Sequence, residues 1–147
     1  CLAGACMIPH LSHYLDRLYA TIQSRREIVV EEFELFDQSA TAARTSELFM
    51  RLRFWDGSLF QVEEALSVRA FAIVKIRYNY HYQHADGTLI FRYDNAPHYP
   101  DLPGFPEHKH QGEQVLSAPA PDLSEALFEI DQHLYPSTLP GEEEAAS

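Results

Sequence analysis

The sequence is poor in cysteine, in positive charge and in long hydrophobic runs. Its only two cysteines, Cys1 and Cys6, lie too close together to staple a fold, which excludes a disulfide scaffold. No apolar run approaches the ~20 residues that a membrane-spanning helix needs. The first residues also lack the basic region and the apolar run of a signal peptide. We therefore expect a cytoplasmic protein with no membrane partner.

Acidic residues dominate the charge. Lysine and arginine number 11 against 22 aspartates and glutamates, so the formal net charge is −11, which opposes non-specific binding to nucleic acid or anionic lipid. A local basic patch remains compatible with this balance. A chain of 147 residues with 46% hydrophobic residues suits one compact domain and excludes wholesale disorder. We expect this domain over residues 1–139, with residues 1–7 flexible and residues 140–147 forming an acidic disordered tail.

Hydrophobic periodicity predicts an α+β fold. A stripe at helical spacing near the start of the chain predicts an N-terminal helix and consists of Leu11, Leu15, Leu18 and Ile22. A second stripe, which follows a capping box at Asp122 and Glu125, predicts a C-terminal helix that ends at Pro136. Alternating apolar residues between them predict an antiparallel meander sheet of about five strands, with both helices packed on it.

Two hairpin turns indicate which side chains share a face of this sheet. At Asp56-Gly57 we expect a three-residue loop with a bulge, because that loop puts Leu52 and Phe60 on one face. At Asp86-Gly87 a tight two-residue type I′ turn pairs Tyr82 with Phe91. The same register pairs His81 with Arg92 and gives the opposite face a polar set: Arg77, Asn79, His81, Arg92 and Asp94.

A proline-rich segment and a group of histidines follow this hairpin. Proline cannot donate to a strand ladder, so we expect an ordered loop after Asn95, with Pro97, Pro100, Pro103 and Pro106. Long loops in compact domains are often functional. The loop can bring one set of side chains back towards the cationic face of the hairpin: His98, His108, Lys109 and His110.

Three stretches of this region resemble the core of the TumE-like toxin family. They are Tyr78–Gln83, Asp86–His98 and Phe105–His110, and the resemblance extends over roughly Tyr78 to Gly112, with weaker agreement in the strands before it. Glu107 stands where the family pattern leads us to expect a histidine. The resemblance implies a small prokaryotic toxin paired with a helix-turn-helix antitoxin. It implies no catalytic assignment, because the family comes with no agreed chemistry.

The first functional hypothesis is a metal-independent ribonuclease that needs no cofactor. RNA cleavage needs a base for the 2′-hydroxyl, an acid for the leaving oxygen and cations for the phosphate charge. Histidine and arginine supply these groups near neutral pH. The candidate catalytic residues are His81, Arg92, Asp94, His98, His108, Lys109 and His110. The candidate RNA-phosphate ligands are Arg77, Asn79, Arg92 and Lys109.

Three other interpretations stay open. His108 and His110, at i and i+2 of an extended segment, put both imidazoles on one side and form a chelating pair for zinc or manganese, which His98, Asp94 or Glu113 completes. A non-enzymatic module docks an antitoxin or another regulator on its surface, and the acidic charge then steers a basic partner. A homodimer is a separate open alternative. A purely structural role has Arg92 paired with Asp94 while the histidines hydrogen-bond to the loop.

Overall fold

The structure is a computed structural model that describes residues 3–25, 27–42, 44–69 and 72–136. The predicted acidic tail lies outside the described residues. These described residues form two helices and seven strands, which follow one another in this order: α1 (Ala3–Gln23), β1 (Val29–Gln38), β2 (Thr45–Arg53), β3 (Leu59–Arg69), β4 (Ala72–Gln83), β5 (Leu89–Asp94), β6 (His108–Gln111), β7 (Gln114–Ser117) and α2 (Leu123–Leu134). No helix in the described ranges is long and apolar enough to cross a membrane.

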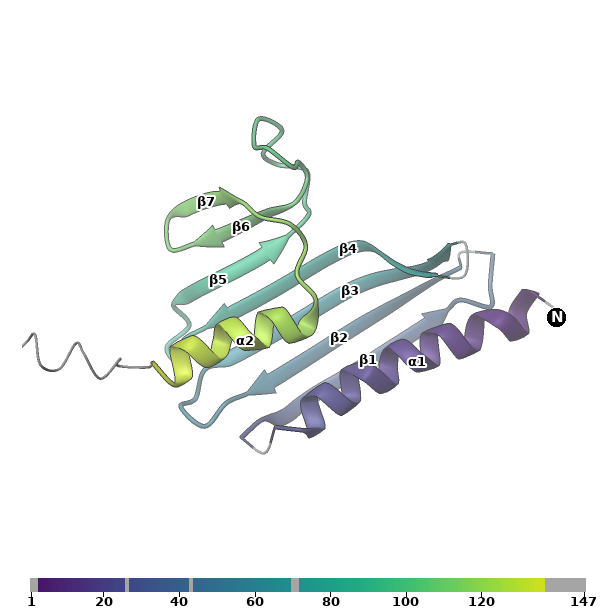
Figure 1. Cartoon of the computed structure of the whole chain (residues 1–147), viewed down its shortest axis with the longest axis horizontal. Coiled ribbons are helices and arrows are strands. Elements are labelled where there is room, and N and C mark those ends of the chain that lie inside the picture. The colour runs from purple at the N-terminus through teal and green to yellow at the C-terminus, as the bar shows by residue number, and fades with distance from the viewer. Residues whose placement is uncertain (1–2, 26, 43, 70–71, 137–147) are drawn as a thin grey trace, which may run out of the picture.

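All seven strands form one antiparallel meander in which spatial order equals chain order, and α1 and α2 lie on the same face of it (Figure 1). The predicted α+β class with a helix at each end is confirmed. The predicted number of about five strands is too low, because residues 108–117 form a hairpin, β6–β7, where we expected loop. The prolines keep only the segment between β5 and β6 out of the sheet.

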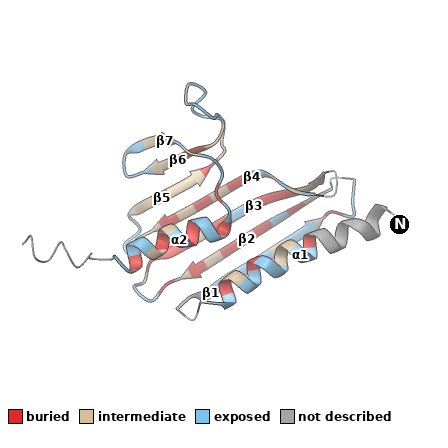
Figure 2. Cartoon of the chain, viewed as in Figure 1, coloured by how far each residue is buried: buried red, intermediate tan, exposed pale blue. Residues whose placement is uncertain are grey.

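The core lies between the sheet and the two helices (Figure 2). Its largest fully buried side chains are the aromatic residues that alternate along β3, β4 and β5: Phe60, Tyr80, Tyr82 and Phe91. Leu127 and Ile130 of α2 and Leu18 and Ile22 of α1 close over them, so both predicted helical stripes belong to the core. The opposite face of the sheet, which we call the open face, is covered by no helix among the described residues.

The two hairpins differ in how well the sequence predicts them. At Asp56-Gly57 the structure has the expected three-residue loop, because the Phe54 N–H donates to the Ser58 carbonyl oxygen at 3.0 Å and Gly57 has a φ of 84°. Leu52 therefore lies opposite Phe60, as predicted.

The predicted two-residue turn at Asp86-Gly87 is wrong. A type I′ turn needs a positive φ at both central residues, whereas only Gly87, at 92°, has one. The His84 N–H donates to the Thr88 carbonyl oxygen at 2.9 Å, so this loop also has three residues. A register shift between Tyr82 and Gln83 absorbs the extra residue, and His81 still lies opposite Arg92.

Candidate functional site

The open face is hollowed into a groove of about 660 Å³ that crosses the strands from β1 to β5 and reaches the proline-rich loop and β6. Strand pairing explains its composition, because one row of directly opposed residues crosses this face: Glu34, Phe49, Glu63, Asn79, Asp94 and His108. Opposed residues of neighbouring strands put their side chains on the same face of a sheet. The row therefore brings together side chains that lie far apart in the sequence.

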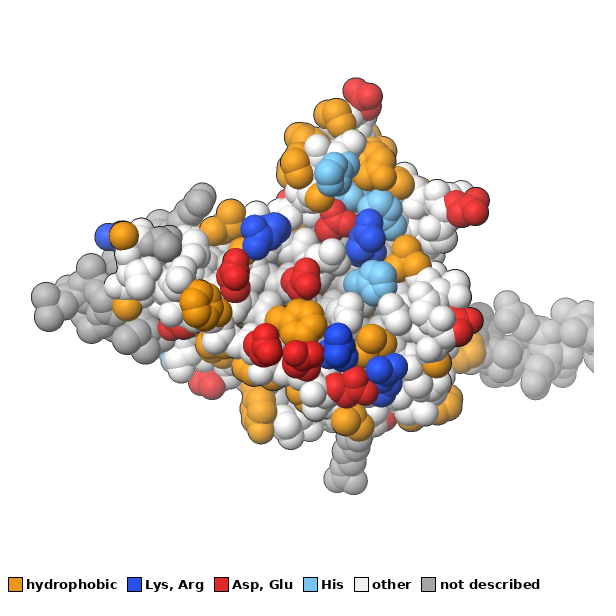
Figure 3. All heavy atoms as spheres, turned by 180° about the vertical axis from the view of Figure 1, so that it is seen from behind, with side chains coloured by type: hydrophobic (Ala, Val, Ile, Leu, Met, Phe, Trp, Pro, Cys, Tyr) orange, Lys and Arg blue, Asp and Glu red, His pale blue; other side chains and the backbone are white. Residues whose placement is uncertain are grey.

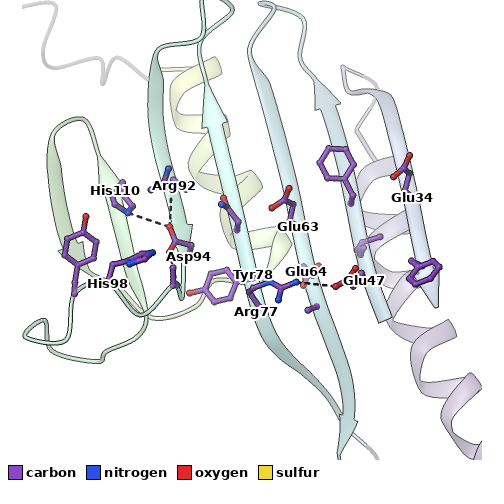
Figure 4. A pocket seen from close by; sticks show the side chains of 17 residues that line it. Glu34, Glu47, Glu63, Glu64, Arg77, Tyr78, Arg92, Asp94, His98 and His110 are labelled. Atoms are coloured by element: carbon purple, nitrogen blue, oxygen red, sulfur yellow. Dashed lines mark hydrogen bonds and ion pairs between the residues drawn. The ribbon is translucent and has the colours of Figure 1, made fainter. Parts of the chain in front are cut away.

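The two ends of the groove carry different chemistry. The histidine end is formed by β5, β6 and the loop between them, with Arg92, Asp94, His98, Tyr99 and His110 (Figure 4). The carboxylate end is formed by β1, β2 and β3, with Glu34, Phe36, Glu47, Phe49 and Glu63. Arg77 and Asn79 lie between the two ends. Seen from the open face, imidazoles gather over one part of the surface, and carboxylates interspersed with hydrophobic and basic side chains lie over another (Figure 3).

Asp94, His108 and His110 form a compact group at the histidine end, which we call the Asp94 centre. Its distances are 3.0 Å from Asp94 Oδ1 to His108 Nε2, 3.1 Å between the two Nε2 atoms, and 3.6 Å from Asp94 Oδ2 to His110 Nε2. The group forms because Asp94 lies opposite His108 and Arg92 lies opposite His110 in the β5–β6 pairing. The i, i+2 spacing of the two histidines then puts their rings on one face.

Hydrogen bonds from neighbouring groups orient the side chains of the Asp94 centre. The Arg92 Nε–H donates to Asp94 Oδ2 and the Ala96 N–H donates to Oδ1, both at 3.0 Å. His108 Nδ1 lies 2.9 Å from the Pro106 carbonyl oxygen, which can only accept, so this nitrogen carries a proton. The Tyr99 ring lies edge-on against both imidazoles, with centroid distances of 5.0 Å to His108 and 5.7 Å to His110.

Burial separates the members of the Asp94 centre. His108 and Asp94 are buried, with 1% and 5% of their surface exposed, so neither is open to a large substrate. The His110 side chain is 15% exposed and lines the groove. Burial of its ring and the nearby Arg92 charge lower the pKa of His110 below its usual range, so the neutral imidazole is favoured near pH 7.

The histidine end unites five of the predicted catalytic residues: Arg92, Asp94, His98, His108 and His110. His98 is exposed at the groove, and its ring has no hydrogen-bond partner within the part of the chain that the structure describes. Arg77 lines the groove and is paired with Glu47 at 3.3 Å. Asn79 also lines it, with a buried Oδ1 that has no partner among the described residues.

Three residues that were predicted for the site lie elsewhere. Lys109 was expected to bind RNA phosphate, but its side chain is on the helix-covered face, where it pairs with Glu129 of α2 and stands 4.9 Å from the Tyr93 ring centroid. His81 shares the open face with Arg92, but it is not part of the groove lining, and its Nε2 lies 3.0 Å from Gln83 Oε1. Glu113, in the β6–β7 turn, lies outside the Asp94 centre.

Sequence reasoning missed Tyr99 and the carboxylate end. Tyr99 gave no signal, because loop residues have no periodicity to place them. For the carboxylate end a signal was present in part, since the hairpin that puts Leu52 opposite Phe60 also puts Phe49 opposite Glu63. The position of Glu34 opposite Phe49 gave no such signal, because β1 does not alternate and its pairing with β2 contains a bulge. Glu107, at the position where a histidine was expected, accepts a hydrogen bond from the Tyr78 hydroxyl.

Comparison with known proteins agrees with the resemblance of the histidine-rich stretch. The family model described as Toxin TumE matches residues 17–134, which is most of the chain. The chain belongs to the TumE toxin family. No curated protein and no solved structure gives a match. The protein is therefore a toxin by family, and membership of a toxin family implies an antitoxin partner.

Proposed function

We propose that this TumE family toxin cleaves single-stranded RNA in the groove of its open face. One observation carries the proposal. A single groove of about 660 Å³ has guanidinium and imidazole groups at one end and aromatic and carboxylate groups at the other. This volume lies in the ordinary range of small-molecule sites. A nucleotide has matching ends, since its phosphate pairs with arginine and its base stacks on aromatic rings.

The histidine end supplies the groups that a phosphate needs. Arg92 lies there with its Nε bonded to Asp94, which leaves the other nitrogens of its guanidinium for a phosphate oxygen. The Arg77 side chain is 72% exposed, and among the residues that the structure describes its one partner is the exposed Glu47, so exchanging Glu47 for phosphate costs little free energy. Together the two arginines stabilise the charge that builds up on the phosphate during cleavage.

His98 is the imidazole that we assign to proton transfer. His108 is buried and His110 points its Nε2 into the Asp94 centre, whereas His98 is exposed at the groove. In the proposed reaction His98 takes the proton of the ribose 2′-hydroxyl while that oxygen bonds to phosphorus. The bond from phosphorus to the 5′-oxygen breaks, and that oxygen leaves with a proton from solvent. The products are a cyclic phosphate and a free 5′-hydroxyl.

The carboxylate end suits the bases of the same strand. Phe36 is 61% exposed and Phe49 is half-buried, so both offer ring surface for stacking. Glu34 and Glu63 flank Phe49 in the pairing register and can accept hydrogen bonds from base amino groups. Carboxylates repel phosphate, which orients the strand with its phosphate towards Arg92 and His98.

The proposal is tested by incubating the purified full chain with a 5′-labelled single-stranded RNA and following cleavage products with time. General acid–base groups contribute roughly 10²–10⁴ in rate, so His98→Ala is expected to slow cleavage by at least about 100-fold. The matched control is His84→Ala, because His84 is exposed in the β4–β5 turn, outside the groove, and should cleave at the unchanged rate. A folded wild-type chain that leaves RNA intact, or unchanged cleavage by His98→Ala, contradicts the proposal.

We further propose that the antitoxin partner is a helix-turn-helix protein encoded beside the toxin gene, as the family resemblance implies. Co-expression of the two genes should abolish the growth arrest that the toxin gene alone causes, and the two proteins should co-purify.

A further inference from the structure

In the Asp94 centre, hydrogen-bond acceptors lie in contact with too few protons between them. His108 Nδ1 donates its proton to the Pro106 carbonyl oxygen, so a neutral His108 ring presents a bare lone pair at Nε2. That lone pair faces a carboxylate oxygen of Asp94 at 3.0 Å and the Nε2 atom of His110 at 3.1 Å. With both rings neutral, the only proton that can lie among these three atoms is one on His110 Nε2, so the 3.0 Å contact between Asp94 and His108 joins two lone pairs that repel each other unless a proton or a metal ion lies between them.

The spacing of these atoms matches the ligand shell of a metal ion. Zinc binds histidine nitrogen and carboxylate oxygen at about 2.0–2.2 Å, and two ligands on a tetrahedral ion are then about 3.3 Å apart. In the Asp94 centre the two imidazole nitrogens are 3.1 Å apart, His108 Nε2 lies 3.0 Å from Asp94 Oδ1, and His110 Nε2 lies 3.6 Å from the other carboxylate oxygen, Oδ2. One ligand atom from each of the three residues lies within 4.8 Å of the others.

The hydrogen bonds around the Asp94 centre resemble those that orient the ligands of metal sites. Metal-ligating histidines usually donate their second ring N–H to a carbonyl or carboxylate, which fixes the ring and its tautomer. His108 does so with Pro106. The carboxylate of Asp94 is oriented in turn by Arg92 and by the Ala96 N–H.

From this geometry we propose that Asp94, His108 and His110 bind one divalent transition-metal ion. Two imidazole nitrogens and one carboxylate oxygen favour zinc over magnesium or calcium, which prefer oxygen ligands alone. Three protein ligands leave a fourth position open, as in catalytic zinc sites. Asp94 and His110 line the groove and His108 is buried behind them, so the open position faces the groove.

A metal ion at the Asp94 centre would take part in the proposed RNA cleavage, and this role of the ion rests on the proposed function. A divalent ion beside Arg92 adds positive charge at the end of the groove where the phosphate is proposed to bind, and so offsets the carboxylates of the other end. His110 Nε2 is then a ligand, which leaves His98 as the imidazole for proton transfer. Binding of the ion itself needs no RNA and is measured without it.

The test uses the full chain, freed of metal with a chelator and dialysed, and titrated with zinc chloride in a calorimeter. We expect one zinc ion per chain. Removal of outer partners of a metal ligand costs about 10–100-fold in affinity, so Asp94→Asn and His110→Ala, each of which removes a ligand, should weaken zinc binding by at least about 100-fold. His98→Ala and His84→Ala should bind zinc as the wild type does. Circular dichroism checks that each variant is folded.

Cobalt(II) gives a second readout, because its visible absorption spectrum reports nitrogen and oxygen ligands in a tetrahedral arrangement. The wild type should develop such a spectrum with cobalt chloride, and Asp94→Asn should not. A folded wild-type chain that binds neither ion, or an Asp94→Asn variant that binds zinc with wild-type affinity, overturns the metal site. RNA cleavage that persists in chelator then leaves the ribonuclease proposal standing, whereas zinc binding without cleavage refutes only the ribonuclease.

Discussion

At the scale of single residues, the alternation of a strand decides which side chains of the His108-Lys109-His110 run can act together. The spacing of the two histidines correctly predicts that their rings share a face, since residues at i and i+2 point the same way. The same rule puts Lys109 on the other face, so grouping it with the histidines contradicted the reasoning that joined them. The i, i+2 alternation of a strand is sufficient to predict the face of all three side chains, provided that it is applied to Lys109 as well as to the two histidines.

Lys109→Met tests this correction. Because Lys109 lies on the helix-covered face, the substitution should leave RNA cleavage and zinc binding unchanged. It leaves Glu129, whose side chain is only 20% exposed, with the Tyr93 hydroxyl as a donor but without its cation, and we expect the free energy of unfolding to fall by about 1–3 kcal/mol. Urea denaturation measures the stability. A large loss of RNA cleavage in a folded Lys109→Met protein would return Lys109 to the functional site.

The partners of Asp94 could not be predicted from local pattern alone. The register placed Asp94 opposite Asn79, but its contacts with His108 and with the Ala96 N–H depend on how the loop returns to the sheet. A loop of several prolines has no periodicity from which its path can be calculated. The sequence therefore indicated which residues are candidates, while the structure decided which of them meet.

At the scale of elements, β6 and β7, the two strands that the sequence analysis missed, are too short for their hydrophobic periodicity to be detected. β6 and β7 have four residues each, and their sequences, HKHQ and QVLS, contain few apolar residues. Their pairing is stabilised by the neighbouring strand β5 and not by strong strand propensity of their own. A long strand such as β2, which alternates over all nine residues, was predictable for the opposite reason, and so was the second half of β4.

Helix α2 offers an element-scale prediction with a pH dependence. Its N-cap is Asp122, whose carboxylate accepts from the Glu125 N–H at 2.8 Å. Loss of an N-cap side chain costs about 1 kcal/mol, so Asp122→Ala should lower the free energy of unfolding by that amount at neutral pH. Hydrogen bonds from the Ser124 hydroxyl and the Glu125 N–H hold the pKa of Asp122 below its usual value of 3.8.

The sign of the pH effect follows from this lowered pKa. The unfolded chain takes up the proton at higher pH than the folded chain does, so the cap stabilises fully above pH 3.8 and loses its contribution as the pH falls through the folded value. Urea denaturation of the wild type and Asp122→Ala should therefore differ at pH 7 and converge in strong acid. A stability difference that persists in strong acid would show that the charge of Asp122 does not matter.

At the scale of the whole molecule, β1 is an edge of the sheet and carries exposed apolar side chains, including Val29 at 60% and Phe33 at 48% exposure. Edge strands with such side chains are surfaces through which other chains pair. The homodimer stays a prediction, and this edge is where a second copy of the chain would add a strand.

With a net charge of −11, the proposed binding of RNA must rely on the few positive charges of the groove and not on the charge of the whole chain. Proteins that bind nucleic acid through a broad basic face release many counterions, whereas the basic side chains that line this groove are those of Arg77 and Arg92. Each neutralised phosphate of a single strand contributes about −0.7 to the slope of log affinity against log salt, so two contacts give a slope of about −1.4. Replacing one arginine should halve it.

Fluorescence anisotropy of a labelled single-stranded RNA, bound to the non-cleaving His98→Ala variant over a series of potassium chloride concentrations, measures this slope. Arg77→Gln should bring it to about −0.7, because one phosphate contact is lost while Arg92 remains. An exposed arginine outside the groove, Arg17, is the control and should leave the slope unchanged. A slope several-fold steeper than −1.4 would mean that RNA binds a surface other than this groove.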